Sequence, residues 1–430
     1  MSPATHDAVD HAARDSYARL LAYLAARSRD LATAEDALAD AFRAALETWP
    51  RNGVPSKPEA WLLIAARRRL IDAGRRARVR AEAMPTLIAL ADEATEMAAA
   101  DAAFPDERLK LMFVCAHPAI DASARTPLML QTVLGLDAAR IGAAFEVQPA
   151  TMGQRLSRAK TKIRDARIRF ELPDASQLPV RLEAVLDAIY AAYGSSWDGV
   201  AGADARRRGL AAEALELGRL VARLMPDEPE ALGLLALMLH CEARRDARRT
   251  SAGEYVPLAQ QDTASWSVSM IDEAEEILTS AARHNRAGRF QFEAAIQSAH
   301  AQRARTGRTN WAAIALLYEG LVRIAPTIGA LVGRAAAVAN ARGCDAGWSV
   351  LQQLPAEPVA RYQPYWALAA RLLATLGRVE ESRAAYARAI ALCDDSAVRD
   401  FLRREINVND WLDPCNGRGR ASVDDERKQQ

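Results

Sequence analysis

Arginines are concentrated between Trp61 and Arg80, where the chain reads WLLIAARRRLIDAGRRARVR. The apolar residues between them recur at helical spacing, which predicts an amphipathic helix from about Pro58 to Arg80. A helix with one arginine face suits the phosphates of a nucleic acid, although basic runs also occur on ordinary solvated helix faces. The net charge of the 430-residue chain is only +1, so this basic helix is a local feature.

A second basic helix is predicted to follow a turn, as in a helix-turn-helix over residues 136–167. Asp137 would cap a short helix over 138–145, residues 146–148 would turn, and Pro149 suits a first helical position because it lacks an N–H. The side chains expected to face DNA are Thr151, Gln154, Arg155 and Arg158 toward base edges, with Lys160 and Lys162 toward phosphates. A plain amphipathic helix is the alternative reading.

An acidic helix precedes both basic ones, over about residues 30–47. Thr33 is expected to cap it, with Asp36 as the acidic residue three positions later, and the helix is expected to stop at Trp49 and Pro50. A change in the sign of the charge favours a different partner, such as a protein surface. The candidate contacts on its exposed face are Asp36, Asp40 and Arg43, with a solvated helix face as the alternative.

The length of 430 residues predicts two or three domains, and the composition predicts an all-α protein. Hydrophobic residues make up 50% and aromatic residues 6%, Ala and Leu dominate, and no convincing alternation typical of strands occurs. Beyond Pro173, paired helical segments are expected over 180–415, and the clearest pair lies within 361–393, with a Gly-Arg turn that resembles a tetratricopeptide hairpin. Residues 416–430 are expected to form a frayed tail.

Several classes of function are not favoured by the sequence. Five dispersed cysteines without a C-x-x-C pair indicate neither a zinc site nor a disulfide framework and fit a reducing cytoplasm. Cys115 and His117 lie close together but are expected to be a buried structural pair. No signal peptide, membrane span, nucleotide loop or catalytic set is recognised, so we expect a cytoplasmic protein that is not an enzyme and uses no metal or cofactor.

The ordered set resembles an extracytoplasmic-function (group IV) sigma factor of bacterial RNA polymerase. The stretches that carry the resemblance are DLATAEDALADAFRAALETW (30–49), PSKPEAWLLIAARRRLIDAGRR (55–76) and LDAARIGAAFEVQPATMGQRLSRAKTKIR (136–164). The chain also resembles the subgroup with a fused tetratricopeptide-like extension, through residues 105–120, 185–195, 224–240 and 291–301. The implied domains are sigma region 2 (10–80), a linker (81–104), sigma region 4 (105–170) and the extension (180–415).

The resemblance implies roles for these residues. Core RNA polymerase would bind Asp36, Asp40 and Arg43, and the helix-turn-helix would read the promoter −35 element. The −10 element would meet Trp61, Arg67, Arg68, Arg69, Arg75, Arg76 and Arg78. Trp61 could stack on a base, although a tryptophan that opens an amphipathic helix is more often a core residue. Many family members have asparagine where this chain has Arg68, which favours contact with phosphates over contact with bases.

The extension is expected to bind the sigma domains or a regulatory protein, with residues 226–240 near the contact, and so to regulate promoter opening. The main alternative is a helix-turn-helix repressor or activator with a tetratricopeptide effector domain, which has no need of the block at 30–80. A helical-repeat scaffold with incidental basic helices is a third possibility, and an enzyme is a distant fourth.

Overall fold

The computed structural model describes residues 3–76, 107–145, 147–194 and 204–411. Regular structure in these residues is helical, apart from an isolated bridge between Arg249 and Tyr255, so the predicted all-α fold is confirmed. The expected linker at 81–104 and the tail at 416–430 lie outside the described residues. The chain divides into two compact units, which are Met1–Trp197 with Ala205–Leu224, and Asp198–Asp204 with Met225–Gln430.

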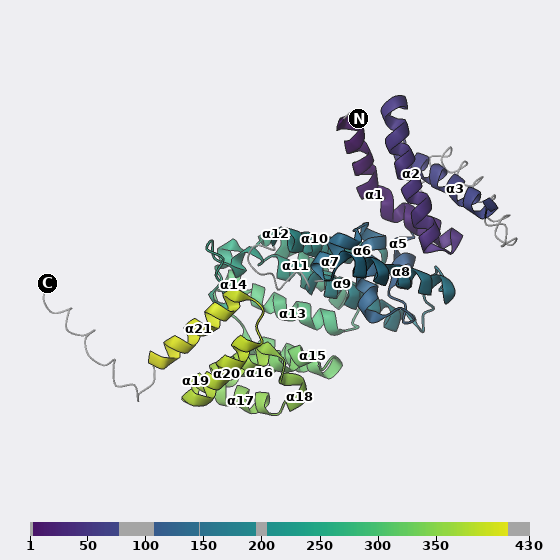
Figure 1. Ribbon diagram of the computed structural model, residues 1–430. Helices are drawn as coiled ribbons and strands as arrows, with labels where there is room; N and C mark the ends of the chain where they lie inside the picture. The colour runs from purple at the N-terminus through teal and green to yellow at the C-terminus, as the bar shows by residue number, and fades with distance from the viewer. Residues whose placement is uncertain (1–2, 77–106, 146, 195–203, 412–430) are drawn as a thin grey trace. The chain divides into compact units, whose positions relative to one another are not determined.

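The first unit begins with three helices that pack on one another: α1 (Pro3–Ser28), α2 (Leu31–Asn52) and α3 (Pro58–Arg76) (Figure 1). The cap predicted at Thr33 is wrong, because Asp30 accepts a hydrogen bond from the Thr33 backbone N–H at 3.1 Å and α2 begins at Leu31. The predicted stop at Pro50 is also too early. Since the helix ends two residues later, before Gly53 at φ +85°, the proline disturbs little of it.

The rest of the first unit comprises α5 (Arg108–Cys115), α6 (Ala122–Leu134), α7 (Ala138–Ala144), α8 (Pro149–Asp165), α9 (Leu178–Gly194) and α10 (Asp204–Leu224). Asp137 caps α7 by accepting from the Arg140 N–H, and α8 begins at Pro149, both as predicted. Gly142 allows the turn between these two helices to be tight. A Cβ there would lie 2.6 Å from the Val147 carbonyl oxygen. The backbone N–H of Val147 donates to the Gly142 carbonyl at 2.8 Å.

Helix α9 is joined to α5 and α6 by side-chain hydrogen bonds. Thr126 Oγ1 donates to the Ala188 carbonyl at 3.2 Å, and the Arg181 guanidinium donates to the Phe113 carbonyl at 2.9 Å. Arg140 of α7 pairs with Glu213 of α10 at 3.2 Å. The first compact unit therefore runs past residue 180, where the extension was expected to begin.

The second unit is a succession of helices. They are α11 (Pro229–Glu242), α12 (Val268–Arg283), α13 (Arg289–Ala301), α14 (Arg303–Thr306), α15 (Trp311–Ile324), α16 (Ile328–Arg342), α17 (Cys344–Gln352), α18 (Ala356–Val359), α19 (Gln363–Thr375), α20 (Val379–Ala391) and α21 (Ser396–Trp411). The predicted hairpin is formed by α19 and α20, with Gly377 at φ +74° between them (Figure 1). Helix α21 was not predicted.

The end of the second unit is fastened to residues 249–255 near its beginning. Arg249 pairs with Asp395, Arg404 pairs with Glu254 at 2.5 Å, and the Tyr255 and Phe401 rings meet edge to face at 5.5 Å. These contacts join residues about 150 positions apart in the chain. They hold α21 in place, together with apolar contacts of Leu402 and Phe401 in the core cluster around α19 and α20.

Candidate promoter and polymerase interface

Helix α8 separates its apolar and polar faces as predicted. Met152, Leu156, Ala159 and Ile163 are buried. The polar face exposes Thr151, Gln154, Arg158 and Lys162. Such a face on the second helix of a helix-turn-helix has the form needed to enter the major groove of duplex DNA.

Arg155 is half-buried at the edge of this polar face. It lies near Asp121, the N-cap of α6. Hydrogen bonds from Ser123 are the main cause of the lowered pKa of the Asp121 carboxyl, and the positive charge of Arg155 adds a smaller contribution. The Arg155 charge thus acts on a nearby acidic group, whereas Thr151 and Lys162 are more open to solvent.

Lys160 is placed differently from the other predicted DNA contacts. Its ammonium group forms an ion pair with Glu35 of α2, and the side chains of Lys160 and Glu35 are only 13% and 15% exposed. Burial raises the pKa of the Glu35 carboxyl, and the neighbouring Lys160 opposes this shift. In this conformation Lys160 is therefore engaged within the protein and does not lie on the exposed face.

The arginines of α3 fall into two groups. Arg67 is 5% exposed, donates to the Tyr23 hydroxyl at 2.6 Å, and places its guanidinium 5.0 Å from the centre of the Tyr23 ring. Arg68 and Arg69 are exposed. The side chains of Arg75 and Arg76 are outside what the structure describes, and so is residue Arg78. Arg67 therefore anchors α3 to α1, and the next two arginines face solvent.

Trp61 packs against a second tryptophan. Its ring meets that of Trp49 edge to face at 5.5 Å, and Trp49 is 2% exposed. This contact fits the core reading of Trp61. The ring stays half-buried, beside the loop that joins α2 to α3.

The candidate polymerase contacts lie on the outer side of α2. Asp36 is exposed, and Asp40 pairs with Arg43 at 2.7 Å along the helix. The Arg43 side chain is 67% exposed. Exposed pairs of this kind add little to stability, so these charges remain available to a partner.

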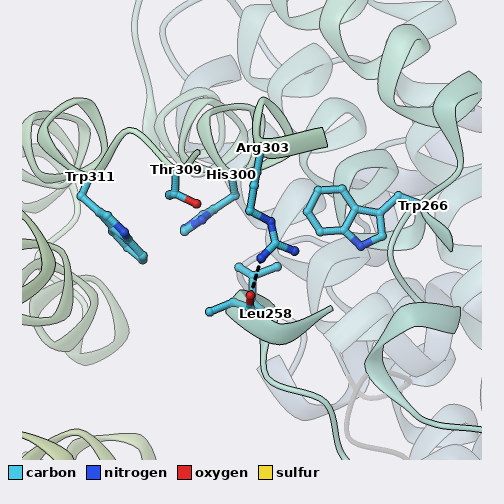
Figure 2. Close-up of a pocket in the computed structure, with 7 residues that line it drawn as sticks. Leu258, Trp266, His300, Arg303, Thr309 and Trp311 are labelled. Carbon is cyan, nitrogen blue, oxygen red and sulfur yellow. Dashed lines mark hydrogen bonds between the residues drawn. The ribbon is translucent and has the colours of Figure 1, made fainter. Parts of the chain in front are cut away.

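The second unit contains a pocket of about 50 Å³, lined by Leu258, Ala259, Trp266, His300, Arg303, Thr309 and Trp311 (Figure 2). Arg303 lies over the Trp266 ring at 5.1 Å and donates to the carbonyls of Ala259 and Gln261. His300 meets Trp311 edge to face at 5.3 Å. Pockets that take small-molecule ligands typically measure about 300–1,000 Å³, so this one is a packing feature.

No group of three or more metal-binding side chains occurs in the described part of the chain. Cys115 is buried and hydrogen-bonded to Thr132 at 3.2 Å, and burial raises the pKa of its thiol to about 12. His117 Nδ1 accepts from the Ala119 N–H at 3.1 Å. Across the same described residues, no helix is both long enough and apolar enough to span a membrane.

We expected residues 226–240 to lie near a regulatory contact, and within this segment residues 231–240 are buried. Glu230 has a structural part, because its carboxylate accepts from the Phe290 and Gln291 backbone N–H groups at 2.9 and 3.2 Å and so caps α13. Gly288 leaves space for it, since a Cβ there would lie 2.2 Å from the Glu230 carboxyl carbon. This segment therefore packs the second unit internally.

Two side-chain contacts between helices were not predicted from the sequence. Tyr23 and Arg67 are 44 residues apart, and Glu35 and Lys160 are 125 residues apart. Helical periodicity could place Tyr23 and Arg67 near buried faces, but it cannot pair them. No local signal connects Glu35 with Lys160.

Taken together, the described residues form an all-helical protein with an N-terminal three-helix element and a helix-turn-helix, whose exposed faces carry charged side chains. Comparison with known families matches residues 13–80 to Sigma-70 region 2, and residues 181–282 to a family of unknown function (DUF6596). No solved structure matches the chain.

A relative in Rhizobium meliloti (strain 1021), Uncharacterized protein R00370, is 38% identical over 384 residues, which cover 88% of this chain and 90% of the relative. The chain belongs to one family with that protein. The match to Sigma-70 region 2 supports its assignment as a sigma-70 family sigma factor with a role in promoter recognition. Core RNA polymerase and promoter DNA are the partners that region 2 implies.

Proposed function

We propose that the chain is a group IV sigma factor that brings core RNA polymerase to promoters with −35 and −10 elements and is regulated by its fused tetratricopeptide-like extension. The observation that carries the proposal is the match of residues 13–80 to Sigma-70 region 2 in a chain that continues into a helix-turn-helix. A repressor that acts alone has no use for region 2. In this proposal the protein acts in the cytoplasm and catalyses no reaction of its own.

The proposed contacts lie on the exposed faces or, for Arg155, at the edge of one. Asp36, Asp40 and Arg43 dock on polymerase, Arg68 and Arg69 neutralise phosphates near the −10 element, and the −35 element is read by Thr151, Gln154, Arg155 and Arg158. Arg75, Arg76 and Arg78 are proposed to extend the −10 contact. Arg67 serves this contact indirectly by holding α3 on α1.

Regulation by the segment that follows residue 180 is supported by contacts within the first unit, where α9 and α10 meet the helices around the helix-turn-helix. The Thr126–Ala188 and Arg181–Phe113 hydrogen bonds and the Arg140–Glu213 pair would pass a change in these helices to α5, α6 and α7. Glu213→Lys is therefore expected to change transcript output at a fixed promoter. Unchanged output and promoter choice would count against this regulatory path.

Reconstituted transcription tests the whole proposal. The full-length protein, sigma-free core polymerase and a promoter library are combined, and run-off transcripts are sequenced. Transcripts from a restricted set of promoters are expected, and Asp36→Lys should lower their yield. Glu171→Gln, on an exposed residue that is not among the proposed contacts, should not. If no transcripts appear and the protein alone binds duplex DNA tightly, a polymerase-independent regulator is the better interpretation.

A further inference from the structure

The first unit contains a contact that neither DNA binding nor polymerase binding explains. Helix α8, which carries the proposed reading face, packs against α2, which carries the proposed docking face. The ion pair of Lys160 with Glu35 lies in this contact. Nearby, Tyr17 of α1 packs on Gly135 after α6, where a Cβ would lie 3.3 Å from the tyrosine ring, and the same ring stacks on Phe42 at 6.3 Å.

The charged pair is largely withdrawn from water. Lys160 and Glu35 are 13% and 15% exposed, and Glu35 Oε1 is a buried oxygen that has no hydrogen-bond partner. A carboxylate in such a place depends on its one cation, because an unpaired charge at a poorly hydrated site is unfavourable. Separating α8 from α2 would return both charged groups to water. The ion pair therefore exists only while these two helices are in contact.

The contact leaves both proposed binding faces open. Asp36 on α2 is exposed, and so are Gln154 and Arg158 on α8. What the contact prevents is separation of the two helices. The −35 and −10 elements are about 25 base pairs apart, or about 85 Å along the duplex at 3.4 Å per base pair. Helices joined by an ion pair cannot reach both elements at once.

We propose that Glu35 and Lys160 hold the protein in a closed state, and that binding to core polymerase opens it by separating α2 from α8. The inference rests on the proposed function, since it takes the two helices to be polymerase-docking and −35-reading elements. The protein must be open to engage both promoter elements. Part of the free energy of polymerase binding is therefore used to separate the two helices. Weakening the ion pair then raises the fraction of protein that is already open.

The pair can be detected in the unaltered protein with a water-soluble carbodiimide, which joins a carboxylate to an amine only where the two touch. Peptide mass spectrometry is expected to find a Glu35–Lys160 link in the free protein, reduced at least about fivefold in the holoenzyme. The Glu107–Lys110 pair, at 2.6 Å, is the internal control. If the control link forms without a Glu35–Lys160 link, or if the latter persists in transcribing holoenzyme, the closed state is refuted.

The affinity for core polymerase gives a second measurement. Glu35→Gln is expected to bind core about fivefold to tenfold more tightly than the natural protein, because a larger fraction is open before binding. The control Glu171→Gln removes the same charge from an exposed site, and the double variant Glu35→Lys with Lys160→Glu should restore the original affinity. Unchanged or weaker binding by Glu35→Gln would contradict the proposal. Absence of any core binding would refute the proposed function, whereas the link in the free protein tests the contact by itself.

Discussion

The arginines of the second unit and those of α3 and α8 are used in different ways. In the second unit many of them bind carboxylates of the same chain, as in Arg245 with Glu242 at 2.6 Å and Arg378 with Glu381 at 2.6 Å. Arg68 and Arg69 of α3 and Lys162 of α8 have no ion-pair partner among the described residues. Net charge near zero therefore conceals a division between cations that hold the fold and cations left for a ligand.

Two histidines packed inside the second unit should make it sensitive to acid. Burial, with Arg244 nearby, lowers the pKa of His240 to about 4, and burial with Arg244 and Arg303 lowers that of His300 to about 4. Below the unfolded pKa of about 6.5 the unfolded chain binds protons that the folded one does not, so stability falls between pH 6.5 and 4. From pH 7 to 4.5 the expected loss is about 2 kcal/mol for each histidine, or about 4 kcal/mol together.

Urea unfolding at pH 7 and at pH 4.5, monitored by hydrogen exchange of the amides of α11 and α13, measures this loss of stability. His240→Met is the matched variant, since both imidazole nitrogens are buried without a hydrogen-bond partner and the replacement leaves no new polar group unsatisfied. It should remove about half of the pH-dependent loss. Equal losses in the variant and the natural protein would show that His240 takes up its proton without cost.

Within α3, Arg67 and Arg68 allow the same comparison at adjacent positions. Arg67→Ala should lower the free energy of unfolding by about 3 kcal/mol, because it removes a charged hydrogen bond and a cation–π contact with Tyr23 from a buried site. Arg68→Ala should change stability by less than about 0.5 kcal/mol and instead weaken DNA binding. Urea unfolding of the two variants tests this, and similar stabilities would show that Arg67 is not an anchor.

Sequence periodicity predicted most helices of both units but not the partners of their charged residues. The helical spacing of apolar residues in α8 determines which face is buried, and Asp137 and Pro149 mark where two helices begin. These features could be predicted because they are local properties of the sequence. Arg67 looked like Arg68 and Arg69 because all three are arginines in one run. Which of them turns inward depends on Tyr23, on another helix, and so could not be predicted from the run itself.

Arg155 tests whether the exposed face of α8 reads bases. If it contacts a guanine through two hydrogen bonds, Arg155→Ala should reduce the preference for the −35 sequence by about 1–3 kcal/mol. Run-off transcription from promoters with single −35 substitutions gives this preference. Because Arg155 also lies beside Asp121, Asp121→Asn serves as a control for loss of that neighbouring charge. Unchanged preference in Arg155→Ala would mean that the reading face lies elsewhere on the helix.

Lys162 should produce the smallest change, and a different kind of change. It is exposed and has no ion-pair partner in the described part of the chain, so a contact with a phosphate is its simplest use. Lys162→Ala should weaken binding to all promoters alike and reduce the slope of log affinity against log salt by about one unit, because one fewer counterion is released. The slope is measured by fluorescence anisotropy of holoenzyme on labelled promoter duplexes from about 50 to 200 mM salt. A promoter-dependent loss with an unchanged slope would make Lys162 a base contact, and the division of α8 between base-reading and phosphate-binding side chains would have to be redrawn.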